Sequence, residues 1–122
     1  NAGHESILVF DQNKNYEYIK SEMPPLGIVK YFTESMVKSS TMDLKDKTLV
    51  VYTDGVTEGY LKNGEELGAE GVQNIINNIE NINPKNIVES IEKELNWGAE
   101  KLRDDITCMA INIDNTELIK KK

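Results

Sequence analysis

The chain has 122 residues, a length that allows one domain with one hydrophobic core. Its formal net charge of −7 argues against binding to the phosphate backbone of nucleic acids. A single cysteine, Cys108, excludes an internal disulfide, and no Cys/His cluster indicates a zinc site. No run of about 20 apolar residues predicts a membrane span, and we expect a cytoplasmic protein. Because the chain opens at Asn1 within a motif-like string, we expect it to be the C-terminal portion of a longer protein.

The first half of the chain predicts strands. Two short apolar runs at 7–10 and 16–19, with a polar stretch between them, are typical of a hairpin. Prolines and a glycine at 24–27 interrupt regular structure. Residues 32–44, rich in Thr, Ser, Val and Met, favour another strand. Residues 48–52 are a continuous apolar run bounded by turn residues, and this run predicts the clearest strand.

The second half predicts two helices and a return strand. Beyond residue 69, apolar residues recur at helical spacing, at Val72, Ile75, Ile76 and Ile79. Asn83 and Pro84 are typical of a second helix start, with Asn83 as the N-cap and Pro84 in the first position. Residues 106–113 favour a last strand. Strands followed by two helices and a strand indicate a layered α+β domain, spanning 1–122.

Two aspartates stand at the ends of apolar runs. Asp54 follows the strand predicted at 48–52, and Asp104 precedes the strand predicted at 106–113. A carboxylate at the end of one buried strand and another at the start of a second can converge on one divalent cation. Oxygen ligands suit Mg²⁺ or Mn²⁺. The pattern therefore predicts one part of a metal-dependent hydrolase.

Each aspartate also has a plainer interpretation. Asp54 with Gly55 fits an ordinary turn between strands, and Asp104 fits a turn or capping residue. Asp104 and Asp105 are adjacent acids that repel each other, so a cation beside them would be favourable. Neighbouring residues of a strand point to opposite faces, so we expect only one of the two to bind the ion.

Three further residues are secondary candidates. The carbonyl of Gly55 is expected to face the site, whereas Glu58 also fits a solvated acid on the next turn. His4 is the only histidine and the only side chain that titrates near neutral pH, which makes it a candidate general acid. We favour a structural role for His4.

Two other functions are alternatives to the metal-dependent hydrolase. The spacing of a calcium-binding EF-hand loop occurs at Asp11, Asn13, Asn15 and Glu22. Tyr16 stands where that loop needs glycine, and the flanks predict strands, so a polar hairpin turn is favoured. The strand followed by Asp-Gly also suggests a haloacid-dehalogenase-like phosphotransferase, but Tyr52 stands where its nucleophilic aspartate would be.

Four strings, in order, carry a family resemblance: Asn-Ala-Gly-His at 1–4, Pro-Leu-Gly-Ile at 25–28, Tyr-Thr-Asp-Gly-Val-Thr-Glu at 52–58 and Asp-Asp-Ile-Thr at 104–107. A fifth, Gly-Glu-Glu-Leu-Gly, lies at 64–68. With these strings the chain resembles the PPM-type, protein phosphatase 2C-like metal-dependent serine/threonine phosphatases, and among them the bacterial branch named for the stage II sporulation E phosphatase. The resemblance covers about the C-terminal half of the family domain.

The resemblance implies an α-β-β-α sandwich, in which a β-sandwich is flanked by helices and two Mn²⁺ or Mg²⁺ ions lie in a cleft. Asp54 and Asp104 would be ligands, joined by aspartates from the other half of the domain. Two such cations would generate hydroxide from water for attack on phosphorus. The substrate would be a phosphoserine or phosphothreonine protein in bacterial signalling, often a phosphorylated anti-sigma-factor antagonist.

The resemblance also sets expectations for the chain by itself. With half of its ligands elsewhere, the isolated chain is expected to be inactive or weakly active. Its uncovered sheet edges predict a dimer. The alternative hypothesis is a catalytically inactive pseudo-phosphatase, or a partner-binding module of the same fold.

Overall fold

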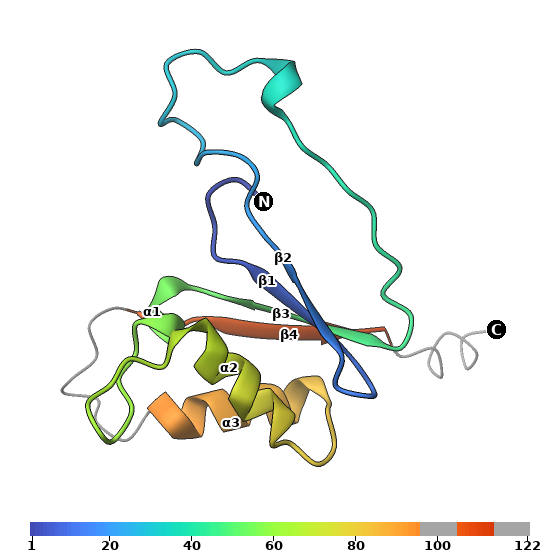
Figure 1. Cartoon of the computed structure of the whole chain (residues 1–122), viewed down its shortest axis with the longest axis vertical. Helices are drawn as coiled ribbons and strands as arrows, with labels where there is room; N and C mark the ends of the chain where they lie inside the picture. The colour runs from blue at the N-terminus through green and yellow to red at the C-terminus, as the bar shows by residue number, and fades with distance from the viewer. Residues whose placement is uncertain (96–104, 114–122) are drawn as a thin grey trace.

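The structure is a computed structural model that describes residues 1–95 and 105–113. In chain order its elements are β1 (Ile7–Asp11), β2 (Tyr16–Ile19), the short 3-10 helix η1 (Glu34–Met36), β3 (Lys47–Tyr52), α1 (Asp54–Thr57), α2 (Gly68–Asn77), α3 (Pro84–Leu95) and β4 (Cys108–Asn112). The strands form one sheet, α2 and α3 lie against one face of it, and residues 20–46 project away from the helices (Figure 1). No helix of the described residues is long and apolar enough to cross a membrane.

The sheet has four strands in the order β2-β1-β3-β4, and every neighbouring pair is antiparallel. Leu8 on β1 lies opposite Val50 on β3, and Tyr52 at the end of β3 lies opposite Cys108 at the start of β4. Because the strands are antiparallel, β3 ends where β1 and β4 begin. The segments 1–6, 53–58 and 105–107 therefore leave the sheet at the same end.

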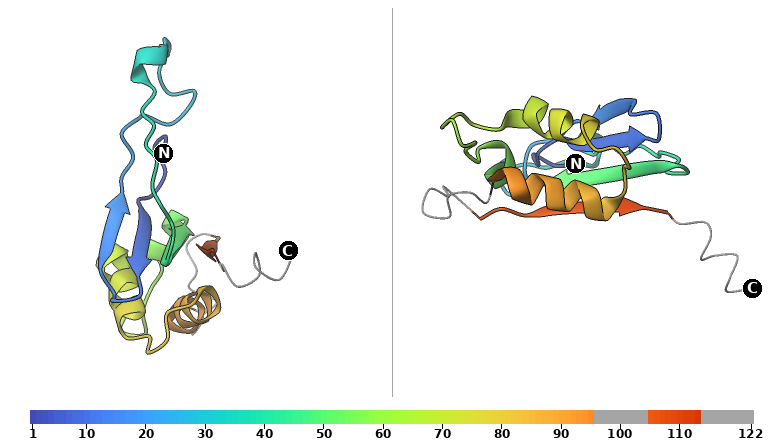
Figure 2. Two further views of the ribbon diagram at one scale, coloured as in Figure 1. Left: turned by 90° about the vertical axis from the view of Figure 1, so that its right-hand side faces the viewer. Right: turned by 90° about the horizontal axis from the view of Figure 1, so that it is seen from below.

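The core lies between the sheet and the two long helices. Alternate residues of β3 face the helices, with Thr48, Val50 and Tyr52 all buried. The helices contribute apolar stripes to the same cluster, and Figure 2 shows both helices on one side of the sheet: the stripes consist of Val72 and Ile76 in α2 and Ile87, Ile91 and Leu95 in α3. Burial of these stripes is the main stabilisation of both helices.

Most of the predicted elements are confirmed. The hairpin at 7–19, the strand ending at residue 52, both helices and the last strand are all present. The side-chain oxygen of Asn83 accepts the backbone N–H of Asn86 at 2.9 Å, so the predicted N-cap of α3 is confirmed. The α+β fold class predicted from the sequence is likewise confirmed.

The strand predicted for residues 32–44 is wrong. This segment holds η1 and otherwise irregular backbone, and none of it joins the sheet. A strand needs a neighbour that accepts and donates its backbone hydrogen bonds. The segment runs from the projecting loop back to the start of β3 (Figure 1), and none of its residues pairs with β2, the strand at that edge of the sheet. Residue propensity alone was therefore insufficient.

The face of the sheet opposite α2 and α3 is largely apolar, and no helix of the described residues covers it. Its residues alternate with those of the core and include Ile7, Leu49, Val51, Met109 and Ile111. Met109 is 50% exposed and Ile111 is 42% exposed, both on the edge strand β4. We refer to this set of residues as the open face.

Candidate metal centre

Asp54 lies at the point where β3 turns into a helix. Thr53 is the extended N-cap of α1, and Asp54 is the first helical residue. The backbone carbonyl of Asp54 accepts the N–H of Glu58 at 2.7 Å and the hydroxyl of Thr57 at 3.1 Å. The short helix α1 thus fixes the backbone of Asp54 while its side chain stays exposed. The turn that joins two strands, the plainer interpretation of Asp54–Gly55, is not what the structure shows.

The segment 105–107 is bonded to the same point. The N–H of Thr53 donates to the carbonyl of Thr107 at 3.0 Å, and the N–H of Thr107 donates to the hydroxyl oxygen of Thr53 at 3.1 Å. The Thr53 hydroxyl is also 3.4 Å from the carbonyl oxygen of Asp105, to which it can donate. Two strings that are far apart in the sequence are therefore adjacent at one end of the sheet.

Gly55 permits this close approach. A methyl group on its Cα would lie 3.0 Å from the carbonyl carbon of Asp105 and closer still to the carbonyl oxygen. Any other residue at position 55 would push the segment 105–107 away from α1. The backbone that approaches Gly55 is that of Asp105.

The strings at 1–4 and 25–28 pack against each other near the same end. Ala2 pairs with Met23 in an isolated bridge, and the N–H of Gly3 donates to the Ser21 hydroxyl at 2.6 Å. Gly3 has φ +73°, and an added Cβ would collide with the ring of Pro25. Position 3 therefore requires glycine, because the backbone has a positive φ there and because Pro25 leaves no room for a side chain.

His4 belongs to this turn. Its N–H donates to the side-chain oxygen of Asn1 at 3.0 Å, and its Nδ1 lies 3.2 Å from the carbonyl oxygen of Glu5. The ring is exposed. These contacts are those of a residue that helps to shape the turn, and a role of His4 in proton transfer remains a prediction.

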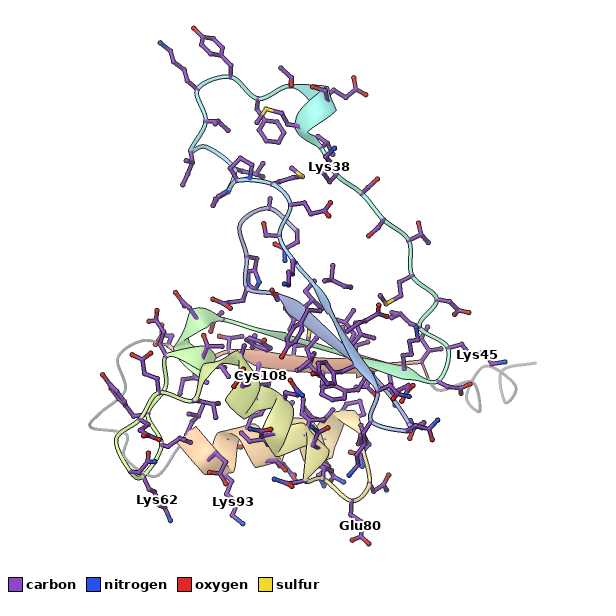
Figure 3. All side chains as sticks on the ribbon, in the orientation of Figure 1. Lys38, Lys45, Lys62, Glu80, Lys93 and Cys108 are labelled. Carbon is purple, nitrogen blue, oxygen red and sulfur yellow. The ribbon has the colours of Figure 1, made fainter. Side chains whose placement is uncertain are left out.

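The sheet residues next to this end are shielded from water. Burial raises the pKa of Tyr52 to about 12 and the pKa of the Cys108 thiol to about 11. These two residues are register partners, one directly before Thr53 and the other directly after Thr107, and Cys108 is labelled in Figure 3. Both shifts indicate that the sheet residues next to the Thr53–Thr107 pair are withdrawn from water.

The donors at this end suit a hard cation. Asp54 and Asp105 are both exposed, and the backbone carbonyl of Asp105 lies beside Gly55. Mn²⁺ and Mg²⁺ prefer oxygen ligands of this kind. Within residues 1–95 and 105–113, no group of three or more His, Cys, Asp or Glu side chains could hold a metal ion. The described residues therefore fit part of a ligand set.

The structure describes some of the remaining predicted site residues and not others. Asp104, the favoured second ligand, lies outside the described residues, and the choice between Asp104 and Asp105 stays open. Glu58 is exposed at the end of α1. Thr53 is not among the site residues predicted from the sequence. Its only signal was a hydroxyl residue between an apolar strand and an aspartate.

The EF-hand interpretation of the β1–β2 turn is wrong. Asp11 accepts the backbone N–H groups of Asn13 and Asn15 at 2.8 and 3.0 Å, and the Asn15 side chain at 2.9 Å. The hydrogen bond from the Asn15 side chain is the main cause that lowers the pKa of Asp11. Its carboxylate therefore closes a polar hairpin turn between two strands, as favoured from the sequence.

Comparison with solved structures identifies the fold. The phosphatase domain of the cell-fate determinant SpoIIE from Bacillus subtilis, presoaked with Mn, matches with a TM-score of 0.62 at 19% identity, over 93% of this chain and 48% of that chain. The SiaA-PP2C domain of Pseudomonas aeruginosa matches with a TM-score of 0.63 at 17% identity, over 93% and 44%. A Mycobacterium tuberculosis structure of RsbU and RsbW domains matches with a TM-score of 0.51 at 21% identity, over 90% and 30%. The chain has the PPM-type phosphatase fold and spans about half or less of the structures it matches.

The family follows from the sequence itself. The profile of the family described as Stage II sporulation protein E (SpoIIE) matches residues 1–114. The chain belongs to this family, as the resemblance predicted. A search of characterised proteins by sequence found no match.

Proposed function

We propose that this chain carries one part of the active site of a metal-dependent phosphoserine/phosphothreonine protein phosphatase. The observation that supports this best is the convergence of Thr53–Asp54–Gly55 with the segment 105–107, which directly follows Asp104 in the sequence. Membership of the SpoIIE family supports the reaction type.

In this proposal Asp54 and either Asp104 or Asp105 bind Mn²⁺ or Mg²⁺, two ions being held by the complete domain. When bound, such ions supply an activated water for attack on phosphorus and neutralise the charge of the phosphate. The helix α1 holds the Asp54 backbone, and Gly55 leaves room for the acidic segment beside it. Glu58 and the Gly55 carbonyl are secondary candidates for the same site.

The proposed substrate is a phosphorylated protein of bacterial signalling in the cytoplasm. An anti-sigma-factor antagonist is the specific candidate that the family resemblance implies. A phosphoprotein brings its own negative charge to a chain of net charge −7, so bound cations are needed to make the encounter favourable.

The test uses the full-length protein that contains this chain. Asp54→Asn keeps the size of the side chain and removes its charge, and should lower Mn²⁺-dependent hydrolysis of a phosphoserine peptide by about 100-fold or more, the scale of losing one charge-stabilising group. Asp104→Asn and Asp105→Asn, made separately, identify the second ligand. Glu80→Gln is the control, because Glu80 lies in the loop between α2 and α3, away from α1 (Figure 3).

Full activity in Asp54→Asn would contradict the proposal. A wild-type protein that binds no Mn²⁺ by calorimetry and hydrolyses no phosphopeptide would instead favour the alternative, a pseudo-phosphatase or partner-binding module of the same fold.

A further inference from the structure

Thr53 ends the hydrogen-bond ladder between β3 and β4 in an unusual way. A regular antiparallel pair of this kind exchanges two backbone bonds, each N–H donating to the opposite carbonyl. Here the N–H of Thr53 donates to the Thr107 carbonyl at 3.0 Å in the regular manner. The returning bond goes from the Thr107 N–H to the hydroxyl oxygen of Thr53, at 3.1 Å, and not to its carbonyl.

The carbonyl of Thr53 has another partner. It accepts the N–H of Val56 at 2.9 Å, which closes the first turn of α1. One carbonyl is thus required by both the sheet and the helix, and the hydroxyl takes the place of the carbonyl in the sheet. The side chain of Thr53 lets β3 turn into a helix at Asp54 without releasing the segment 105–107.

We propose that Thr53 is a positioning residue of the metal site, whose hydroxyl holds the segment that follows Asp104 at a fixed place beside Asp54. This inference rests on the proposed function. Gly55 supports it from the opposite side, since it allows the Asp105 backbone to approach as closely as the hydroxyl bond requires. Without the hydroxyl, the Thr107 N–H is left to water, and the acidic segment can move relative to α1.

Metal affinity is the quantity that such a residue controls. Groups that orient ligands without touching the ion typically change metal affinity or activity by about 10- to 100-fold. Thr53→Val has nearly the same shape and lacks the acceptor, so it should weaken Mn²⁺ binding by about 10-fold or more. Thr53→Ser keeps the acceptor and should bind Mn²⁺ nearly as the wild type does.

The experiment measures Mn²⁺ binding by calorimetry on the metal-free full-length protein, together with the Mn²⁺ concentration that gives half-maximal phosphatase activity. Thr48→Val is the matched control, because it removes a hydroxyl from β3, the strand that ends just before Thr53, and that hydroxyl has no hydrogen-bond partner among the described residues. Thr53→Ala is measured in parallel, so that the result does not depend on the folding of a single variant. Thermal unfolding of each metal-free variant separates loss of fold from loss of affinity.

The expected result is weaker Mn²⁺ binding in Thr53→Val and Thr53→Ala, recovery in Thr53→Ser, and no change in Thr48→Val. The half-maximal Mn²⁺ concentration should rise while turnover at saturating Mn²⁺ changes little. Wild-type affinity in Thr53→Val, or equal weakening in Thr53→Ser, would overturn the role of the hydroxyl even where Asp54→Asn abolishes binding. Absence of Mn²⁺ binding in the wild type would overturn the proposed function and this inference together.

Discussion

Tyr52 places a hydroxyl in the core just beneath the candidate metal centre. The side chain is 2% exposed, and its oxygen has no hydrogen-bond partner among the described residues. A buried polar group without a partner costs about 1–3 kcal/mol. Tyr52→Phe is therefore expected to raise the free energy of unfolding by about 1 kcal/mol at neutral pH, measured by urea denaturation.

Tyr52 also makes the stability of the wild type depend on pH in the alkaline range, and Tyr52→Phe should lack this dependence. The folded state holds the pKa of Tyr52 at about 12, above the ordinary value near 10 of an unfolded chain. The stability that depends on the neutral phenol is complete below pH 10 and is lost as the pH rises towards 12. Wild-type stability should fall more steeply than that of Tyr52→Phe over this interval. A variant less stable than wild type at neutral pH would mean that the hydroxyl has a partner after all.

Among the elements, α3 has an N-terminus that is capped by one side chain. Asn83 caps its N-terminus, and the apolar stripe of α3 covers the sheet next to β4. Asn83→Ala leaves the Asn86 N–H without this acceptor and should lower the free energy of unfolding by about 1 kcal/mol. Asn83→Asp keeps an acceptor and adds a favourable charge at the helix start, so its thermal unfolding should match or exceed that of wild type. Equal losses in both variants would show that the amide nitrogen, and not the cap, matters.

Elements with their own periodicity were predictable from the sequence. The spacing of apolar residues predicts the two helices, and a continuous apolar run predicts the strand at 48–52. The place of Asn83 before a proline predicts the start of the second helix. The segment 32–44 misled because Thr, Ser and Val favour strands only where a neighbouring strand is present. Asp54 could be placed at the end of its strand, but the helix that starts there could not, because it depends on Thr53 and on residues 105–107. Contacts between residues so far apart in the sequence leave no local sequence pattern.

At the scale of the whole molecule, the open face is an apolar surface that is partly exposed among the described residues. It lies opposite the helices, its edge strand β4 exposes Met109 and Ile111, and Ile113, directly after β4, is exposed as well. Exposed apolar edge strands pair readily with other chains. The 122-residue chain studied alone is therefore expected to self-associate, with an apparent mass by light scattering above 13.8 kDa that rises with concentration.

A charge on that surface should oppose the association. Ile111→Lys places an ammonium group on the open face and should shift the chain towards a monomer. Asn81→Lys adds the same charge in the exposed loop between α2 and α3 and should leave the association unchanged. A wild-type chain that stays monomeric at every concentration would contradict this prediction, as would equal effects of the two variants.

The bond between Thr107 and Thr53 joins positions 54 apart, and this separation has a consequence for biosynthesis. A chain emerges from the ribosome N-terminal end first, so β1, β2, β3 and both long helices are released before β4. They can begin to fold together, but Asp54 acquires its neighbouring segment only after the codons for β4 have been translated. A nascent polypeptide that stalls after α3 would thus carry the aspartate without its acidic partner. On the proposed function, only chains translated beyond β4 would dephosphorylate a substrate, and shorter nascent chains would be inactive without a separate inhibitor.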